Sequence, residues 1–108
     1  MELEQTIHVT VETYRPTPIL HIVEDDTDRE IHIVVDDFAV PTGTTAVIEY
    51  YIEREAHTTP EATAEGNTFT FDATELIVND GILPANLRIN TADGSLRSFL
   101  FHLHIHTL

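Results

Sequence analysis

The sequence predicts an all-β fold of about seven or eight strands, whose length and spacing fit a sandwich or a barrel; of the two we expect an antiparallel β-sandwich. Apolar and polar residues alternate with a period close to two along most of the chain, as they do in half-buried strands. Turn-forming residues interrupt this alternation at short intervals. No stretch keeps a helical apolar period for more than a turn or two, so we expect helix to be a minor component.

The first half of the chain contains four predicted strands. Pro16 and Pro18 separate the first from the second, the charged segment Glu24–Asp28 is a predicted turn, and Pro41–Thr44 contains a glycine suited to a turn. The residues expected to point into the core share alternate positions: Ile7, Val9 and Val11; Ile31, Ile33 and Val35; and Ala46, Ile48, Tyr50 and Ile52, with the short apolar run Ile19–Val23 between the first two sets.

The second half begins with a predicted loop, Arg54–Gly66, which is rich in threonine, glutamate and alanine. Phe69 and Phe71 mark a short strand, Thr74–Val78 fits either a strand or one helical turn, and Asn79-Asp80-Gly81 is a turn signal. Asp93-Gly94 predicts a type I′ hairpin turn. It joins strands over Leu83–Thr91 and Leu96–His106, with Leu87 and Ile89 on one and Phe99, Phe101, Leu103 and Ile105 on one face of the other.

Charge is the most unusual global property of the chain. Its 108 residues include 19 acidic residues, five arginines, no lysine and no cysteine, which gives a formal net charge of −14 at pH 7. Such a charge repels phosphate backbones, so nucleic acid is not an expected partner, whereas basic proteins and divalent cations are compatible with it. Disulfides and thiolate metal sites are excluded. No apolar run approaches the roughly 18 residues of a membrane span, and the N-terminus lacks a basic signal region, so we expect synthesis in a cytoplasm.

Histidines on the last predicted strand are the candidate metal ligands. His102, His104 and His106 occupy alternate positions and so share one face, on which two neighbours, most simply His102 and His104, can reach one zinc ion. A complete site needs a further ligand from another strand, for which His8, His32 and nearby carboxylates are candidates. The other interpretation is that these are ordinary outward positions of an amphipathic strand, and no cofactor or metal is then expected.

Catalysis is not expected. The chain has no cysteine nucleophile, no Gly-x-Ser-x-Gly motif and no phosphate-binding glycine loop, so we identify no catalytic residues. A sugar-binding aromatic platform is also poorly supported, because tryptophan is absent and the neighbouring Tyr50 and Tyr51 must face opposite ways.

The order of strands and turns resembles a known family. Asp37-Phe38 leads through Pro41–Thr44 into Ala46–Ile52, followed by Glu53-Arg54; the later matching segments are Asn67–Phe71, Glu75-Leu76, Gly81, Leu87–Ile89, Asp93-Gly94, Phe99 and Phe101. This pattern is similar to the N-terminal domain of phage baseplate upper proteins, an immunoglobulin-like sandwich of siphophage tails. It covers most of the chain from about Ile7 onward, but it is a strand rhythm and not a fixed signature.

The resemblance implies a structural adaptor, located in the virion tail, that binds other tail and baseplate proteins. Family members usually continue into a helical, trimer-forming region, so residues 1–108 would be one sandwich domain, either alone or as the N-terminal domain of a longer chain, and a homo-oligomer is a further option. The expected contact surfaces are strand edges and the Arg54–Gly66 loop, with partner contacts at Tyr51, Glu53, Arg54 and His57. The alternative function is a ligand-binding module for carbohydrate or metal on the histidine-rich face.

Overall fold

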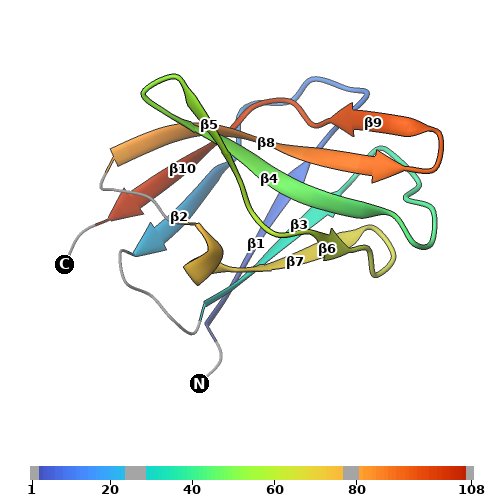
Figure 1. Ribbon diagram of the computed structural model, residues 1–108, viewed down its shortest axis with the longest axis horizontal. Coiled ribbons are helices and arrows are strands. Elements are labelled where there is room, and N and C mark those ends of the chain that lie inside the picture. The colour runs from blue at the N-terminus through green and yellow to red at the C-terminus, as the bar shows by residue number, and fades with distance from the viewer. Residues whose placement is uncertain (1–2, 24–28, 77–80, 107–108) are drawn as a thin grey trace.

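The computed structural model describes residues 3–23, 29–76 and 81–106. These residues form two packed β-sheets, which confirms the predicted all-β sandwich (Figure 1). The smaller sheet has the order β1-β3-β7, and the larger has the order β2-β10-β8-β4-β5, with β6 paired to β4 and β9 paired to β8. The strands are β1 (Leu3–Val9), β2 (Ile19–Val23), β3 (Arg29–Val35), β4 (Thr45–Ile52), β5 (Glu55–Thr58), β6 (Ala62–Thr63), β7 (Thr68–Asp72), β8 (Gly81–Thr91), β9 (Gly94–Arg97) and β10 (Phe101–His106).

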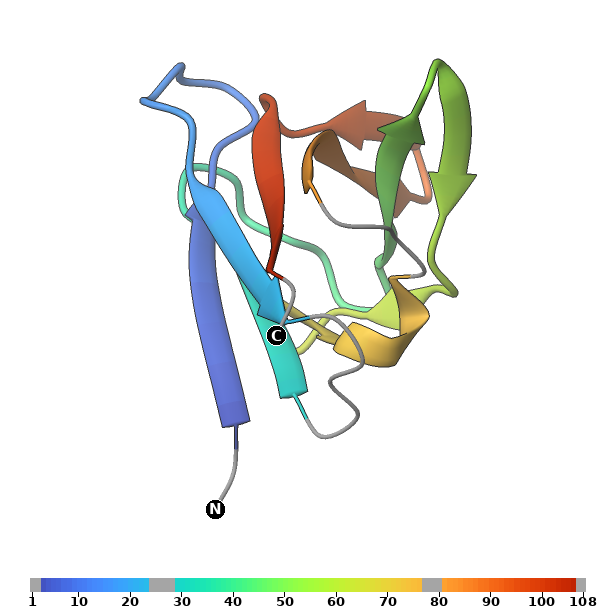
Figure 2. The same ribbon diagram turned by 90° about the vertical axis from the view of Figure 1, so that its left-hand side faces the viewer.

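Most strand pairs are antiparallel, as predicted for the sandwich, but two of them are parallel. β1 pairs with β3 in parallel, and β2 pairs with β10 in parallel, while the other pairs are antiparallel. Parallel neighbours require a crossover connection between them. For β1 and β3 that connection contains β2, which lies in the opposite sheet. Figure 2 shows β1 and β2 side by side where the two sheets meet, and across this seam Gln5 Oε1 accepts a hydrogen bond from the His21 backbone N–H at 2.6 Å.

The core lies between the sheets and is made of the predicted inward faces. Apart from the partly buried Val11 and Ile52, the inward residues predicted for the strands up to β8 are buried. Burial of a large apolar side chain contributes roughly 1.5–3 kcal/mol, so these alternating faces supply the main driving force for the fold. The fully buried large side chains are Phe69, Phe101, Leu20, Ile31, Ile33, Ile48, Leu87, Ile89, Leu103 and Val35.

A bulge divides the strand that the sequence predicts over Leu96–His106. Arg97 pairs with Arg88, Ser98 N–H donates to the Leu87 carbonyl at 3.0 Å, and Phe101 pairs with Ala85. Two residues, Phe99 and Leu100, therefore lie opposite the single residue Asn86, and the extra residue reverses the in–out alternation. Phe99 is consequently 41% exposed while Phe101 is fully buried, so the prediction that Phe99 faces the core was wrong.

The left-handed hairpin turn lies at an unexpected position. Glu53 and Arg54 have φ angles of +48° and +73°, and they connect the paired residues Ile52 and Glu55, as the two central residues of a type I′ turn do. The turn between β8 and β9 instead has Ala92 and Asp93 at its centre, and neither residue has a positive φ, so the type I′ prediction there was wrong. The Asp-Gly pair is displaced by one position, with the glycine already in β9.

The segment predicted as the loop Arg54–Gly66 contains two short strands, β5 and β6, which pair with β4. Its composition lacks apolar alternation because β5 lies at the sheet edge and most of its residues are exposed. At the kink between the two strands, Thr59 Oγ1 accepts a hydrogen bond from Ile48 N–H at 3.0 Å and so replaces a ladder bond.

A 3₁₀ turn, η1 (Ala73–Glu75), covers the start of the segment Thr74–Val78. The sequence left a strand and one helical turn as alternatives for this segment. Ile77 and Val78, the Glu24–Asp28 turn and Asn79-Asp80 lie outside the described residues. Among the residues that are described, no helix is long and apolar enough to cross a membrane.

Candidate functional site

Three large apolar side chains gather at one end of the sandwich and form what we call the apolar apex: Tyr14, Phe99 and Leu100. They are 73%, 41% and 46% exposed, respectively. The rings of Tyr14 and Phe99 meet edge to face, with centroids 5.7 Å apart and planes at 84°. Single exposed apolar side chains are ordinary, but a cluster that contains paired aromatic rings is typical of protein-binding surfaces.

The apex is held in place by the loop between β1 and β2. The Asp37 carboxylate accepts hydrogen bonds from the backbone N–H groups of Val11, Glu12 and Thr13 at 2.9, 2.9 and 2.7 Å. Partial desolvation acts to raise the pKa of Asp37, but these N–H donors together hold it below its ordinary value. The carboxylate therefore fixes the backbone that leads directly into Tyr14.

The bulge supplies the other half of the apex and is tied to the same loop. Phe99 N–H donates to the Thr10 carbonyl at 3.1 Å, so the turn that exposes Phe99 also lies against the start of the loop. Arg15 and His8 both contact the Asp36 carboxylate, at 3.3 and 2.8 Å. The Arg15 guanidinium therefore balances the charge of the Asp36 carboxylate beside the apolar surface.

The hollows near these loops are too small for a typical organic ligand. The hollow beside the apex, lined partly by Pro16, Pro18, Phe99 and Leu100, has a volume of about 20 Å³, enough for a water molecule. A second hollow, between Pro41–Thr44 and Thr91–Asp93, measures about 220 Å³. Small-molecule sites usually enclose roughly 300–1,000 Å³. The apex is thus better matched to another protein surface than to a small ligand.

The residues predicted for partner contacts all lie on the β4–β5 hairpin but do not share one surface. Glu53 and Arg54 form its exposed turn. Tyr50 points into the core and His57 stacks on it, with ring centroids 5.5 Å apart, so Tyr51 projects from the opposite face of the sheet. The structure therefore brings Glu53 and Arg54 together and separates Tyr51 from His57; a role in binding stays a prediction.

On β10, His102 and His104 share an outward face as predicted and are both half-buried. The register partner of His104 on β2 is His21, and the two rings meet edge to face at 5.3 Å between centroids. The side chain of His106 lies outside the described residues. His8 and His32, the proposed additional ligands, belong to the smaller sheet and have acidic partners there.

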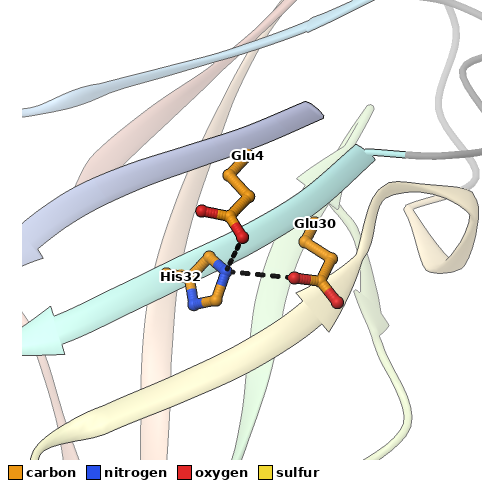
Figure 3. Close-up of side chains that lie close together, drawn as sticks. All are labelled: Glu4, Glu30 and His32. Carbon is orange, nitrogen blue, oxygen red and sulfur yellow. Dashed lines mark hydrogen bonds and ion pairs between the residues drawn. The ribbon is translucent and has the colours of Figure 1, made fainter. Parts of the chain in front are cut away.

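His32 takes part in a different cluster of metal-ligating groups on the outer face of the smaller sheet. Figure 3 shows Glu4 from β1 converging with Glu30 and His32 from β3. His32 Nε2 lies 3.2 Å from Glu30 Oε2 and 3.9 Å from Glu4 Oε1, and the three ligand atoms lie within 4.8 Å of one another. Within the described part of the chain, this is the group with three such ligands close together.

A buried carboxylate occupies the outer face of the larger sheet. Glu49 is buried and accepts a hydrogen bond from Arg97 Nε at 2.6 Å, while Arg88 Nη1 lies 3.9 Å from its other oxygen. The hydrogen bond and the negative charge of Glu49 raise the pKa of Arg97 above its ordinary value. Because two arginines neutralise this carboxylate, we interpret the group as structural.

The sequence reasoning missed the apolar apex, and it named His32 as a candidate ligand without joining it to Glu4 and Glu30. Tyr14 lies in a segment where apolar and polar residues do not alternate. Phe99 has the sequence spacing of a core residue, but the bulge turns its side chain outward. Glu4 and Glu30 are far apart in the sequence, and their proximity depends on the parallel pairing of β1 with β3. The spacing of Glu30 and His32 was the one local signal, since residues two apart on a strand share a face.

Comparisons with known proteins leave the chain without an assigned family. No family model matches the sequence, and no curated protein matches it significantly. The fold and the surface together define a β-sandwich protein with an exposed apolar patch.

Proposed function

We propose that this chain is a non-catalytic adaptor domain that binds another protein through the apolar apex. The observation that carries the proposal is the exposure of Tyr14, Phe99 and Leu100 on a backbone that Asp37 and Thr10 hold in place. Aromatic side chains presented on an ordered surface lose little conformational entropy on binding, which favours affinity. The shallow hollow beside them supports a protein partner over a small molecule.

The partner we propose is a different protein with a neutral or basic rim, and not a second copy of the chain. Each copy carries a formal charge of −14, so two copies repel one another, whereas a basic rim is attracted. Beside the apex, the charges of Arg15 and Asp36 already balance one another. Apolar contact therefore supplies the local attraction, and the overall charge selects the partner.

Within this class, we propose a role in a phage tail, as one of the parts that attach receptor-binding proteins to the baseplate. The support for this role is the resemblance to baseplate upper proteins, which spans most of the sequence. A sandwich with an exposed apolar patch at its loops is compatible with such a role. The proposed partners are then other tail and baseplate proteins, and the proposed location is the virion.

The test is binding of the full chain to the products of the genes on either side of its own. Each product is co-expressed with the chain, and complexes are measured by size-exclusion chromatography with light scattering. The variant Tyr14→Ser/Phe99→Ser/Leu100→Ser should weaken a complex at least about tenfold, because exposed anchors dominate interface energies. The matched control, Ile19→Ser/Ile82→Ser, removes two other exposed apolar side chains, 42% and 63% exposed, and should bind normally. Equal binding by the apex variant, or no complex with any neighbour, contradicts the proposal.

A further inference from the structure

We propose that Glu4, Glu30 and His32 form a binding site for a divalent cation, with zinc as the ion that fits best. The site lies on the outer face of the smaller sheet and joins β1 to β3 (Figure 3). It is separate from the apolar apex and does not depend on the proposed adaptor function.

The ligand atoms are already close to the positions that a zinc ion requires. Zinc binds imidazole nitrogen and carboxylate oxygen at about 2.0–2.2 Å, so two ligand atoms of a tetrahedral site lie roughly 3.4 Å apart. The distances from His32 Nε2 to Glu30 Oε2 and to Glu4 Oε1 are 3.2 and 3.9 Å. All three ligand atoms lie within 4.8 Å of one another, and both glutamates are exposed, so rotation about their side-chain bonds can adjust this spacing.

The sheet holds these three side chains together through its register. Glu4 and Glu30 are directly paired residues of two parallel strands, and His32 is two residues beyond Glu30 on the same face. Like charges placed directly opposite each other on neighbouring strands are destabilising. A cation between the two carboxylates removes this repulsion, so binding should also strengthen the attachment of β1 to β3.

A neighbouring strand orients the imidazole for metal binding. Thr70 on β7 is the register partner of His32, and its Oγ1 lies 3.3 Å from His32 Nδ1. Thr70 Oγ1 can accept a hydrogen bond from Nδ1–H, which leaves the lone pair of Nε2 directed toward the carboxylates. Metal-bound histidines typically donate their other N–H in this way, and the partner outside the ligand set improves affinity.

The choice of zinc follows from the donor set. One imidazole nitrogen and two carboxylate oxygens suit zinc, with water completing the coordination, whereas calcium and magnesium prefer oxygen ligands alone. The competing interpretation needs no metal: the two carboxylates hold His32 Nε2 by direct contact alone. The two interpretations differ in the response to added zinc, because only a metal site binds the ion.

The experiment is isothermal titration calorimetry of the full chain with zinc chloride at pH 7.5, repeated with calcium and magnesium. We expect one zinc site per chain, and substitutions Glu4→Gln, Glu30→Gln and His32→Gln should each weaken it at least about tenfold. Thr70→Val, which keeps all three ligands, should also weaken it. The matched control is His102→Gln/His104→Gln, which removes the histidine pair of β10 and should leave the affinity unchanged.

Two further measurements keep the test decisive if a substitution perturbs folding. Zinc should shift the His32 ring signals in the nuclear magnetic resonance spectrum of the unmodified chain more than those of His102. Zinc should also raise the melting temperature of the unmodified chain, and that of Glu30→Gln less. Zinc binding that survives all three ligand substitutions, or that depends on His102 and His104 instead, overturns the proposal.

Discussion

The β4–β5 turn places two ordinary residues in a backbone conformation that favours asparagine and glycine. Glu53 and Arg54 have φ angles of +48° and +73°. A left-handed conformation costs a residue other than glycine roughly 1–2 kcal/mol, because its Cβ approaches the following carbonyl oxygen. The substitution Glu53→Asn/Arg54→Gly replaces this pair with the sequence most favoured in type I′ turns.

The expected gain follows from two opposing contributions. Relief at the two positions contributes about 2 kcal/mol at the lower end of that range, while the new glycine makes the unfolded chain more flexible and costs about 0.4–1 kcal/mol. The free energy of unfolding should therefore rise by about 1 kcal/mol, which corresponds to a melting temperature higher by roughly 4 °C. Neither side chain is buried, so loss of packing should contribute little.

The assay is urea unfolding followed by far-ultraviolet circular dichroism, since the chain has no tryptophan. At a typical slope for a small domain, the midpoint should increase by about 0.5–1 M urea. Arg54→Ala removes the same charge but keeps a Cβ at the left-handed position, so it should not stabilise. Ala92→Asn/Asp93→Gly introduces the same dipeptide where no left-handed residue exists, and it should not stabilise either. Equal stabilities for all variants would refute the assignment of the turn.

Two other predictions concern stability. Asp37→Ala should lower the unfolding free energy at pH 7 by about 1 kcal/mol, because backbone N–H groups of the β1–β2 loop lose their acceptor. The folded-state pKa of Asp37 is lowered, so its contribution to the free energy of unfolding is present above the ordinary value of 3.8 and is lost as the pH falls through the folded-state pKa. Urea unfolding at pH 7 and pH 3 should therefore show a smaller difference between wild type and variant in acid. Phe101→Ala should lower the free energy of unfolding by about 3–5 kcal/mol, whereas Phe99→Ala should lower it by less than about 1 kcal/mol. Thermal unfolding measures both changes, and similar losses of stability for the two variants would contradict the bulge.

The candidate sites show how far sequence reasoning reaches on the protein surface. His102 and His104 were correctly placed on one outward face, because two residues on the same strand suffice for that statement. The cluster of Glu4 with Glu30 and His32 depends on two strands from different parts of the chain, and the apolar apex depends on a loop meeting a bulge. Contacts between segments that are distant in the sequence leave no periodic signal in either segment alone.

By itself, the amino-acid sequence determined which side of most strands is buried, because the alternation of apolar and polar residues follows directly from the pleat of a strand. Strands such as β3, β4 and β7 were oriented correctly on this basis. Only the tertiary structure decided which strands are neighbours, that β1 and β3 run in parallel, and that a bulge at Phe99 and Leu100 exposes an aromatic side chain. Pairing depends on backbone hydrogen bonds that every residue other than proline can form, so the side-chain pattern does not specify the partner strand.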